Sequence, residues 1–297
     1  MKERITSIDR GVLFMLLASL SFAFMGGFAK ELSRSIPPLE VTFFRNVFGV
    51  ILVVASLWKY PLNQRGGKPW LLLFRGSIGF LALLAYFYDF AHIPLGEAVT
   101  YNKTSPIFVA IFAYLFLGEK LPRLAWLAVF LGFVGIVLIA KPDGLALDKY
   151  DLLGIFSGVG AALAYTSIRE LRRYYDTRAI VLSFMGVGTI GPILLMAVSP
   201  WVQAPALDFL FAEFVMPQGS MWLYALGVGF FATISQLLMT RAYELSQAGI
   251  VGTVSYSNIV FAVIIGVMLG DPFPDVWSSL GIGLVIGSGW LVTRKQN

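Results

Sequence analysis

Ten stretches of this 297-residue chain are apolar over about the length that a helix needs to cross the hydrocarbon core of a membrane, which is ~20 residues. This pattern constrains the fold strongly, because lipid-exposed backbone must satisfy its own polar groups within helices or a closed barrel. The sequence therefore predicts an all-α integral membrane protein with ten transmembrane helices. The stretches lie near residues 11–29, 39–58, 70–90, 95–117, 121–140, 151–168, 178–198, 220–240, 248–269 and 275–293.

Composition supports this class and excludes others. Charged residues make up 13% of the chain and hydrophobic residues 58%, whereas soluble domains carry about 25% charged residues. The chain has no cysteine and one histidine, His92, which excludes disulfides, thiolate chemistry and a two-histidine metal site. No Walker-type glycine-rich motif is present, and the carboxylates of the spans are isolated, so neither ATP hydrolysis nor an intramembrane enzyme is expected. We expect no metal and no cofactor.

The basic residues indicate the orientation. With the N-terminus inside, 15 of the 22 lysines and arginines fall on cytoplasmic segments and four on the opposite side. This asymmetry predicts a multi-pass protein of the cell (inner) membrane with both termini in the cytoplasm. It also accounts for the formal net charge of +5, so no nucleic-acid partner is needed. The remaining three basic residues, Arg45, Arg75 and Lys103, lie within spans.

Weak internal similarity divides the chain into two halves. A shift of 152 residues aligns Leu117-Gly118-Glu119 with Leu269-Gly270-Asp271 and Ser105 with Ser257, at the same helix ends. We expect a first five-helix repeat over 1–141 and a second over 142–297. Because five is odd, the repeats have inverted topology, which is typical of secondary transporters with a site near the membrane midplane.

The loop at 199–219 is longer than the others and has no lysine or arginine. The helical spacing of its apolar residues predicts a short helix near 205–216 on the outer membrane surface. A packed cap over the extracellular mouth is the alternative.

Small residues at four-residue spacing predict close helix contacts. They occur as Gly154 with Gly158 in span six, Gly283 with Gly287 in span ten, and Ala128 with Gly132 in span five. Spans five and ten are equivalent in the repeat and are expected to be structural helices at the periphery.

The chain resembles the EamA branch of the drug/metabolite transporter superfamily. The resemblance rests on the five-plus-five plan, on the segment from Ala98-Val99-Thr100 to Ser105-Pro106-Ile107-Phe108, on Leu117-Gly118-Glu119-Lys120, and on Arg45 within Phe43-Phe44-Arg45-Asn46. It implies a permease, often a metabolite exporter, with a cavity lined mainly by spans 1–4 and 6–9. The counterpart of Pro106 in span nine is Asn258, so the second copy of the motif differs.

Lys103 is the most informative side chain, because it lies about nine residues into span four, where a charge is costly unless it is paired or hydrated. Pro106 follows it and removes one backbone hydrogen bond. One hypothesis is that Lys103 binds an anionic or zwitterionic substrate or a coupling carboxylate. The alternative is a structural ion pair with Glu97, Asp89 or Glu40.

Further candidates lie on the same and neighbouring spans. Arg45 either contacts the substrate or extends to the surface, and Arg75 is expected to extend to the surface. The candidate substrate-binding residues are Lys103, Tyr101, Thr100, Asn102, Arg45, Tyr86, Tyr256 and Asn258. The candidate coupling carboxylates are Glu97, Asp89 and Glu40, for which exposure at the mouth is the alternative.

The function favoured by these features is secondary active transport of a small polar or zwitterionic metabolite by alternating access. A lipid or lipid-linked head-group flippase on the same scaffold is the alternative, whereas a channel is disfavoured because no filter-like segment is present. The expected partners are the small-molecule substrate and the lipid bilayer, with the protein as a monomer or homodimer. The coupling ion (proton, sodium or none) and the direction of transport stay open.

Overall fold

The computed structural model describes residues 2–59, 66–117, 123–140, 147–171, 173–202, 204, 207–245 and 254–294. Regular structure in this part of the chain is helical, which confirms the predicted all-α class. The helices are α1 (Lys2–Ser33), α2 (Pro38–Lys59), α3 (Pro69–His92), α4 (Leu95–Asn102), α5 (Ser105–Leu117), α6 (Arg123–Ala140), α7 (Lys149–Leu171), α8 (Thr177–Val198), the 3₁₀ turn η1 (Ser199–Trp201), α9 (Met221–Leu245), α11 (Ser257–Met268) and α12 (Val276–Arg294).

These helices correspond to the ten predicted spans. Six of them are long and apolar enough to cross a membrane on their own, within α1, α2, α3, α7, α8 and α9. The fourth span consists of two helices, α4 and α5, and the fifth, ninth and tenth correspond to α6, α11 and α12. The break in the fourth span is local, because only Lys103 and Thr104 separate the end of α4 from the start of α5.

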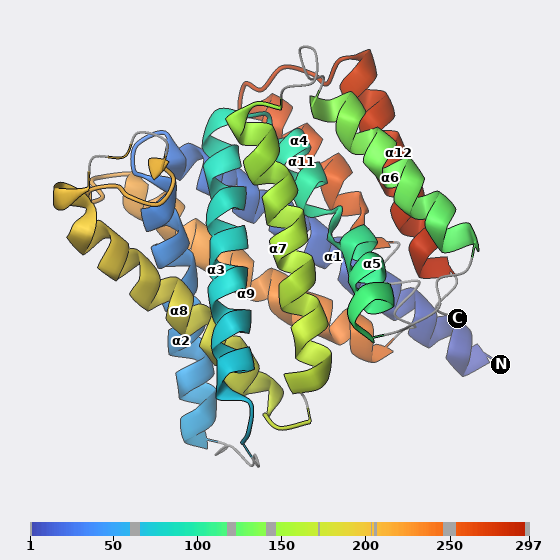
Figure 1. The fold of residues 1–297 in the computed structure, drawn as a ribbon, viewed down its shortest axis with the longest axis horizontal. Helices are drawn as coiled ribbons and strands as arrows, with labels where there is room; N and C mark the ends of the chain where they lie inside the picture. The colour runs from blue at the N-terminus through green and yellow to red at the C-terminus, as the bar shows by residue number, and fades with distance from the viewer. Residues whose placement is uncertain are drawn as a thin grey trace.

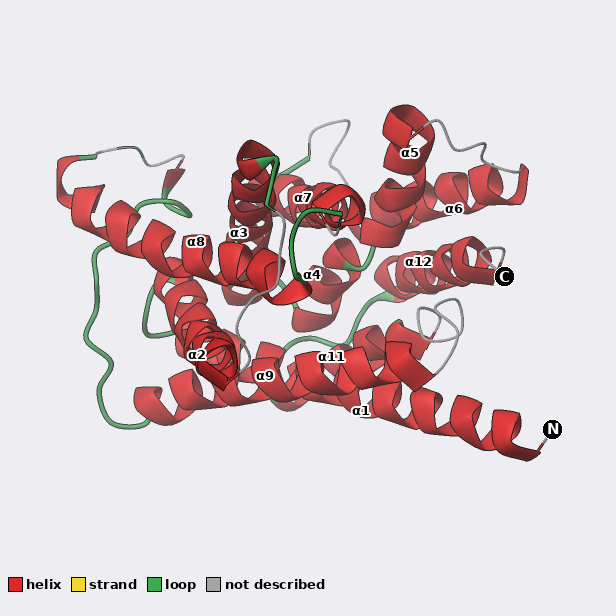
Figure 2. Ribbon diagram, turned by 90° about the horizontal axis from the view of Figure 1, so that it is seen from below, coloured by secondary structure: helices red, strands yellow, loops and turns green. Residues whose placement is uncertain are grey.

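The helices pack in pairs that follow the inverted repeat (Figures 1 and 2). Helix α1 packs on α9 as its counterpart α7 packs on α3, and α2 packs on α9 as α8 packs on α3. Two pairs join equivalent helices directly, α2 with α8 and α6 with α12, and α4 of the fourth span packs on α11 of the equivalent ninth span. Two inverted five-helix repeats around a pseudo-two-fold axis give this pattern, so the predicted architecture is confirmed.

Glycines permit the close approach of α7 to the broken span. A Cβ atom at position 154 would lie 2.6 Å from Cδ2 of Tyr101, and one at Gly158 would meet the Thr104 hydroxyl. The predicted small-residue contact in α7 is therefore present.

In α12 the predicted pair Gly283 and Gly287 faces open space. The contact with α6 instead uses Gly281, whose Cβ position lies 2.6 Å from the Gly135 carbonyl oxygen. The rotation of α12 about its axis decides which of its glycines contact α6. The spacing of glycines in the sequence alone does not determine that rotation. The α6–α12 pair lies at one edge of the bundle (Figure 1), as predicted for spans five and ten.

The segment after α8 differs from the surface helix predicted near 205–216. Residues 207–210 form a single turn and 211–218 have no regular secondary structure, while 203, 205 and 206 lie outside the described residues. The backbone N–H of Val215 donates to the Glu40 carboxylate, 3.0 Å away at the start of α2, instead of to a helical carbonyl.

Candidate substrate-binding site

Lys103 lies at the break between α4 and α5. It is the C-cap residue of α4, and its own backbone N–H still donates to the Val99 carbonyl at 2.9 Å. Pro106 has no N–H to donate to the Asn102 carbonyl, and its ring disfavours continuation of the helix from the preceding turn. Helix α4 lies in the interior between α7 and α11 (Figure 2), so the break brings Lys103 to the boundary between the two repeats.

The equivalent position of the second repeat is built in a similar way. Helix α11 begins at Ser257, the residue that the 152-residue shift aligns with Ser105 at the start of α5. The residue before it, Tyr256, is the N-cap, with φ −69° and ψ −16°. Transporters with inverted repeats commonly use discontinuous helices to expose backbone polar groups at a binding site.

Lys103 is partly buried, and its side-chain amine forms no ion pair or hydrogen bond with the residues that the structure describes. Two predicted partners are engaged elsewhere: the Glu97 carboxylate accepts a hydrogen bond from the Ser278 hydroxyl at 2.7 Å, and Glu40 accepts from Val215. The structural ion pair offered as the alternative is therefore not formed in this conformation.

The polar neighbours of Lys103 on α4 are mostly engaged in packing. Tyr101 is 1% exposed, and its hydroxyl donates to the Asp151 carboxylate on α7 at 2.6 Å. The Thr100 hydroxyl donates to the Gly96 carbonyl one turn earlier. Asn102, at the last position of α4, is partly buried. Among the polar side chains of α4 and of the break that follows it, those of Lys103 and Asn102 are therefore the best placed to contact a ligand in this conformation.

The remaining aromatic and amide candidates lie in the core. Tyr256 is 2% exposed, and Asn258 holds α11 against α1 by donating to the Ser19 carbonyl at 2.8 Å. Tyr86 packs on Phe90 with ring centroids 4.4 Å apart. The structure places these three near the apolar cluster between the repeats and does not bring their polar atoms to Lys103 through any hydrogen bond.

Asp89 differs from the other candidate carboxylates. It lies on α3, is fully buried, and neither of its oxygens has a hydrogen-bond partner among the described residues. A buried carboxyl group without a donor or a cation is costly. Of the three candidate carboxylates, Asp89 is therefore the one whose surroundings favour binding of a proton or a cation.

Arg45 and Arg75 lie in the interior of the bundle. They are 6% and 7% exposed, and their guanidinium carbons lie 5.3 Å and 4.9 Å from the centroid of the Phe184 ring on α8. The expected extension of Arg75 to the surface is wrong, because its side chain turns toward α8. The sequence drew attention to Arg75 because a charged residue within a span is rare. Nothing in the sequence distinguishes Phe184, the ring that both arginines approach, from the other 24 phenylalanines.

One end of the bundle, here called the Lys30 end, joins the repeats by polar contacts. Lys30 on α1 pairs with Asp271 after α11 at 2.8 Å and donates to the Ile93 carbonyl at 2.9 Å. The other Asp271 oxygen accepts from the Leu95 N–H at 2.8 Å. Lys149 pairs with Asp208 nearby. These contacts link α1, α4, α7 and the loops after α8 and α11.

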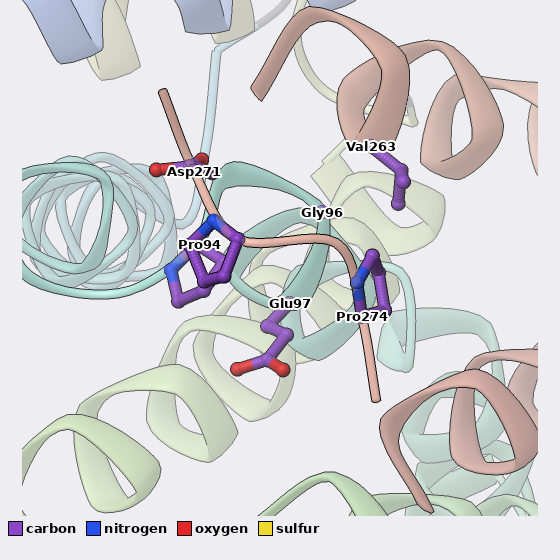
Figure 3. A pocket seen from close by; sticks show the side chains of 7 residues that line it. Pro94, Gly96, Glu97, Val263, Asp271 and Pro274 are labelled. Atoms are coloured by element: carbon purple, nitrogen blue, oxygen red, sulfur yellow. The ribbon is translucent and has the colours of Figure 1, made fainter. Parts of the chain in front are cut away.

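A small pocket beside this network does not have room for a substrate. Its volume is ≈ 10 Å³, about the space that one water molecule needs. Figure 3 shows Asp271 and Pro94 on one side of the pocket, with Glu97 and Pro274 on the other. The remaining lining residues are Gly96, Val263 and Pro272.

Comparisons with known proteins identify the class to which this architecture is similar. The model of the EamA-like transporter family matches residues 9–141 and again 148–294. An uncharacterized transporter of Helicobacter pylori is 34% identical over 95% of this chain and 94% of its own length. The Pseudopaline exporter CntI of Pseudomonas aeruginosa is 34% identical over 97% of this chain and 98% of its own. The Riboflavin transporter of Vibrio cholerae is 24% identical over 97% and 94%.

A solved crystal structure of a protein with 18% identity supports the fold. It matches with a TM-score of 0.56 over 99% of this chain and 97% of its own.

Proposed function

The chain belongs to the EamA-like transporter family, and from this we propose that it is a secondary active transporter of a small polar or zwitterionic metabolite. Transport would proceed by alternating access around a site near the middle of the membrane. The protein is a membrane transporter and not an enzyme; the substrate class and the mechanism are the proposal.

The observation that carries the proposal is the position of Lys103. It lies at the break of the fourth span, where the repeats meet, and has no counter-ion among the described residues. An ionisable residue inside a membrane is costly unless it is hydrated or paired. An anionic group of a substrate that enters the site would supply the missing partner, and rocking of the repeats would then carry it across.

Asp89 is proposed as the coupling carboxylate, because it is the buried one without a donor among the described residues. Glu97 and Glu40 are proposed to act mainly at the Lys30 end, where both accept hydrogen bonds.

The orientation proposed from the basic residues places the Lys30 end outside and both termini in the cytoplasm of a cell with an inner membrane. The repeats are proposed to span 1–141 and 142–297. A monomer or a homodimer is compatible with an architecture in which one chain supplies both repeats.

Transport by purified protein in liposomes tests this function. A thermal-shift screen against amino acids, nucleobases, quaternary amines and carboxylates first identifies a stabilising compound, whose labelled form is then used for uptake. We expect Lys103→Ala to lose uptake and Lys103→Arg to retain part of it, while Lys59→Ala, an exposed lysine at the end of α2, behaves as wild type. Normal uptake by both folded Lys103 variants would refute the role of this residue.

The same liposomes test the flippase alternative. They can carry a fluorescent head-group-labelled lipid in place of the soluble compound. Translocation of the lipid without uptake of any soluble compound would contradict metabolite transport and favour a flippase.

A further inference from the structure

We propose that Arg45 and Arg75, together with Phe184, form a subsite that binds a carboxylate group of the transported substrate. This inference rests on the proposed transport function and assigns a substrate class to it. Arg45 is the eighth residue of α2 and Arg75 the seventh of α3. Because α2 and α3 are antiparallel, the two side chains come from opposite ends of the bundle and meet at the ring of Phe184 on α8.

The first argument is the lack of a counter-ion. Arginine stays protonated in proteins, so the site holds two buried positive charges beside one aromatic ring. No carboxylate among the described residues forms an ion pair with either one. Nε of Arg45, and Nε and Nη1 of Arg75, are buried without an acceptor. Uncompensated buried charges are strongly destabilising, so an anion that is absent from the chain itself would complete this site.

The second argument is that the surrounding helices leave room for these groups. A Cβ atom at Gly79 would lie 2.5 Å from Nη1 of Arg75 and 2.9 Å from the Phe184 ring. Arg45 is oriented by a hydrogen bond from its Nη1 to Asn46 at 3.0 Å. The Asn46 amide in turn donates to the Thr42 carbonyl at 2.8 Å.

Guanidinium groups bind carboxylates and phosphates through paired hydrogen bonds. We assign a carboxylate because it is planar and matches the paired donors of a guanidinium group, and because the ring of Phe184 lies against both arginines. Inorganic phosphate therefore serves as the discriminating probe.

The experiment measures the melting temperature of the purified full-length protein with glutamate, succinate, inorganic phosphate or choline. The variants are Arg45→Gln, Arg75→Gln, Arg75→Lys and Gly79→Ala, and the matched control is Arg173→Gln, which alters an exposed arginine at the end opposite Lys30. We expect a carboxylate to stabilise wild type and the control. The apparent affinity should fall at least about tenfold in both glutamine variants and less in Arg75→Lys.

A second readout separates binding from a structural role. Removing a buried, unpaired charge relieves its desolvation cost, so the ligand-free glutamine variants should melt at the same temperature as wild type or higher. A large drop in the ligand-free melting temperature of both would overturn the proposal, since it would show that the arginines are structural. Stabilisation by phosphate and not by either carboxylate would overturn the assignment to a carboxylate.

Uptake into liposomes distinguishes the two proposals. If a carboxylate binds through the arginines but is not transported, the transport proposal fails and the subsite stands. If a carboxylate is transported equally well by wild type and by both glutamine variants, the subsite fails and the transport proposal stands.

Discussion

Charged residues at the Lys30 end form ion pairs, whereas the basic residues in the middle of the bundle form none with the residues that the structure describes. At the Lys30 end, Lys30 pairs with Asp271 and Lys149 with Asp208, and these contacts connect segments far apart in the sequence. In the middle, Arg45, Arg75 and Lys103 have no ion-pair partner among the residues that the structure describes.

This difference suggests that the first group stabilises one state of the transporter, whereas the second is kept for a ligand. Under the proposed alternating access, the Lys30–Asp271 pair, which joins the two repeats, would break when that end opens, so its strength would set part of the equilibrium between states. A cation without a partner costs stability in the empty protein and recovers it when an anion binds. Four substitutions test the comparison, from the largest expected effect to the smallest.

Asp271→Ala should have the largest effect on stability. Lys30 and Asp271 have side chains that are 10% and 12% exposed, and breaking a buried ion pair by removing one partner costs about 3–5 kcal/mol. The melting temperature should fall clearly, while the double variant Lys30→Met/Asp271→Leu recovers much of the loss. Arg34→Gln, which alters a more exposed arginine at the same end, is the control. An unchanged melting temperature in Asp271→Ala would show that this pair does not hold the Lys30 end together.

Lys103→Met should separate function from stability. Because the amine has no partner among the described residues, the ligand-free melting temperature should stay the same or rise. Uptake of the stabilising compound should fall by about tenfold or more, equivalent to ~1.4 kcal/mol. Liposome uptake and thermal unfolding of the same preparation measure both. A marked loss of stability would place Lys103 with the paired residues of the Lys30 end.

Asp208→Asn should have a smaller effect than Asp271→Ala. The Lys149 and Asp208 side chains are 35% and 52% exposed, and solvent-exposed ion pairs contribute about 0.2–1 kcal/mol. Partial burial raises the pKa of Asp208, but hydrogen bonds from Lys149 and Tyr88 lower it overall. The loss in melting temperature should shrink in ~1 M salt, because salt screens exposed charges. A salt-independent loss would indicate a more buried contact.

Glu170→Gln should have the smallest effect. The hydrogen bond from Lys68, 2.7 Å away, lowers the pKa of Glu170 below its usual value. The ionised pair therefore adds to stability at neutral pH, and this contribution is lost as the pH falls through the lowered pKa. Lys68 is exposed and Glu170 is half-buried, so the pair is well solvated and thermal unfolding at pH 7 should differ little between Glu170→Gln and wild type. A large difference would mean that an ion pair also closes the end of the bundle opposite the Lys30 end.

Much of the fold could be predicted because it depends on hydrophobicity along the chain. The apolar runs and the odd number of spans per half are properties of the sequence, and the packing of α1 on α9 and of α7 on α3 follows the predicted symmetry. The site could be predicted only in part. Lys103 was identified because Pro106 and its depth in the span are both visible in the sequence. Arg75 was misplaced because its distance from the helix end suggests surface extension, whereas its partner Phe184 belongs to another repeat.

Tyr101 shows why polar residues on one face of a predicted helix do not define a site. The spacing on α4 places it beside Lys103, but its hydroxyl is bonded to Asp151, 50 residues later in the chain. The sequence by itself determined that this protein crosses the membrane in ten spans arranged as two inverted halves, since burial in lipid depends on local composition. Only the tertiary structure decided which charges are paired, because that depends on how each helix is rotated against helices that are distant in sequence.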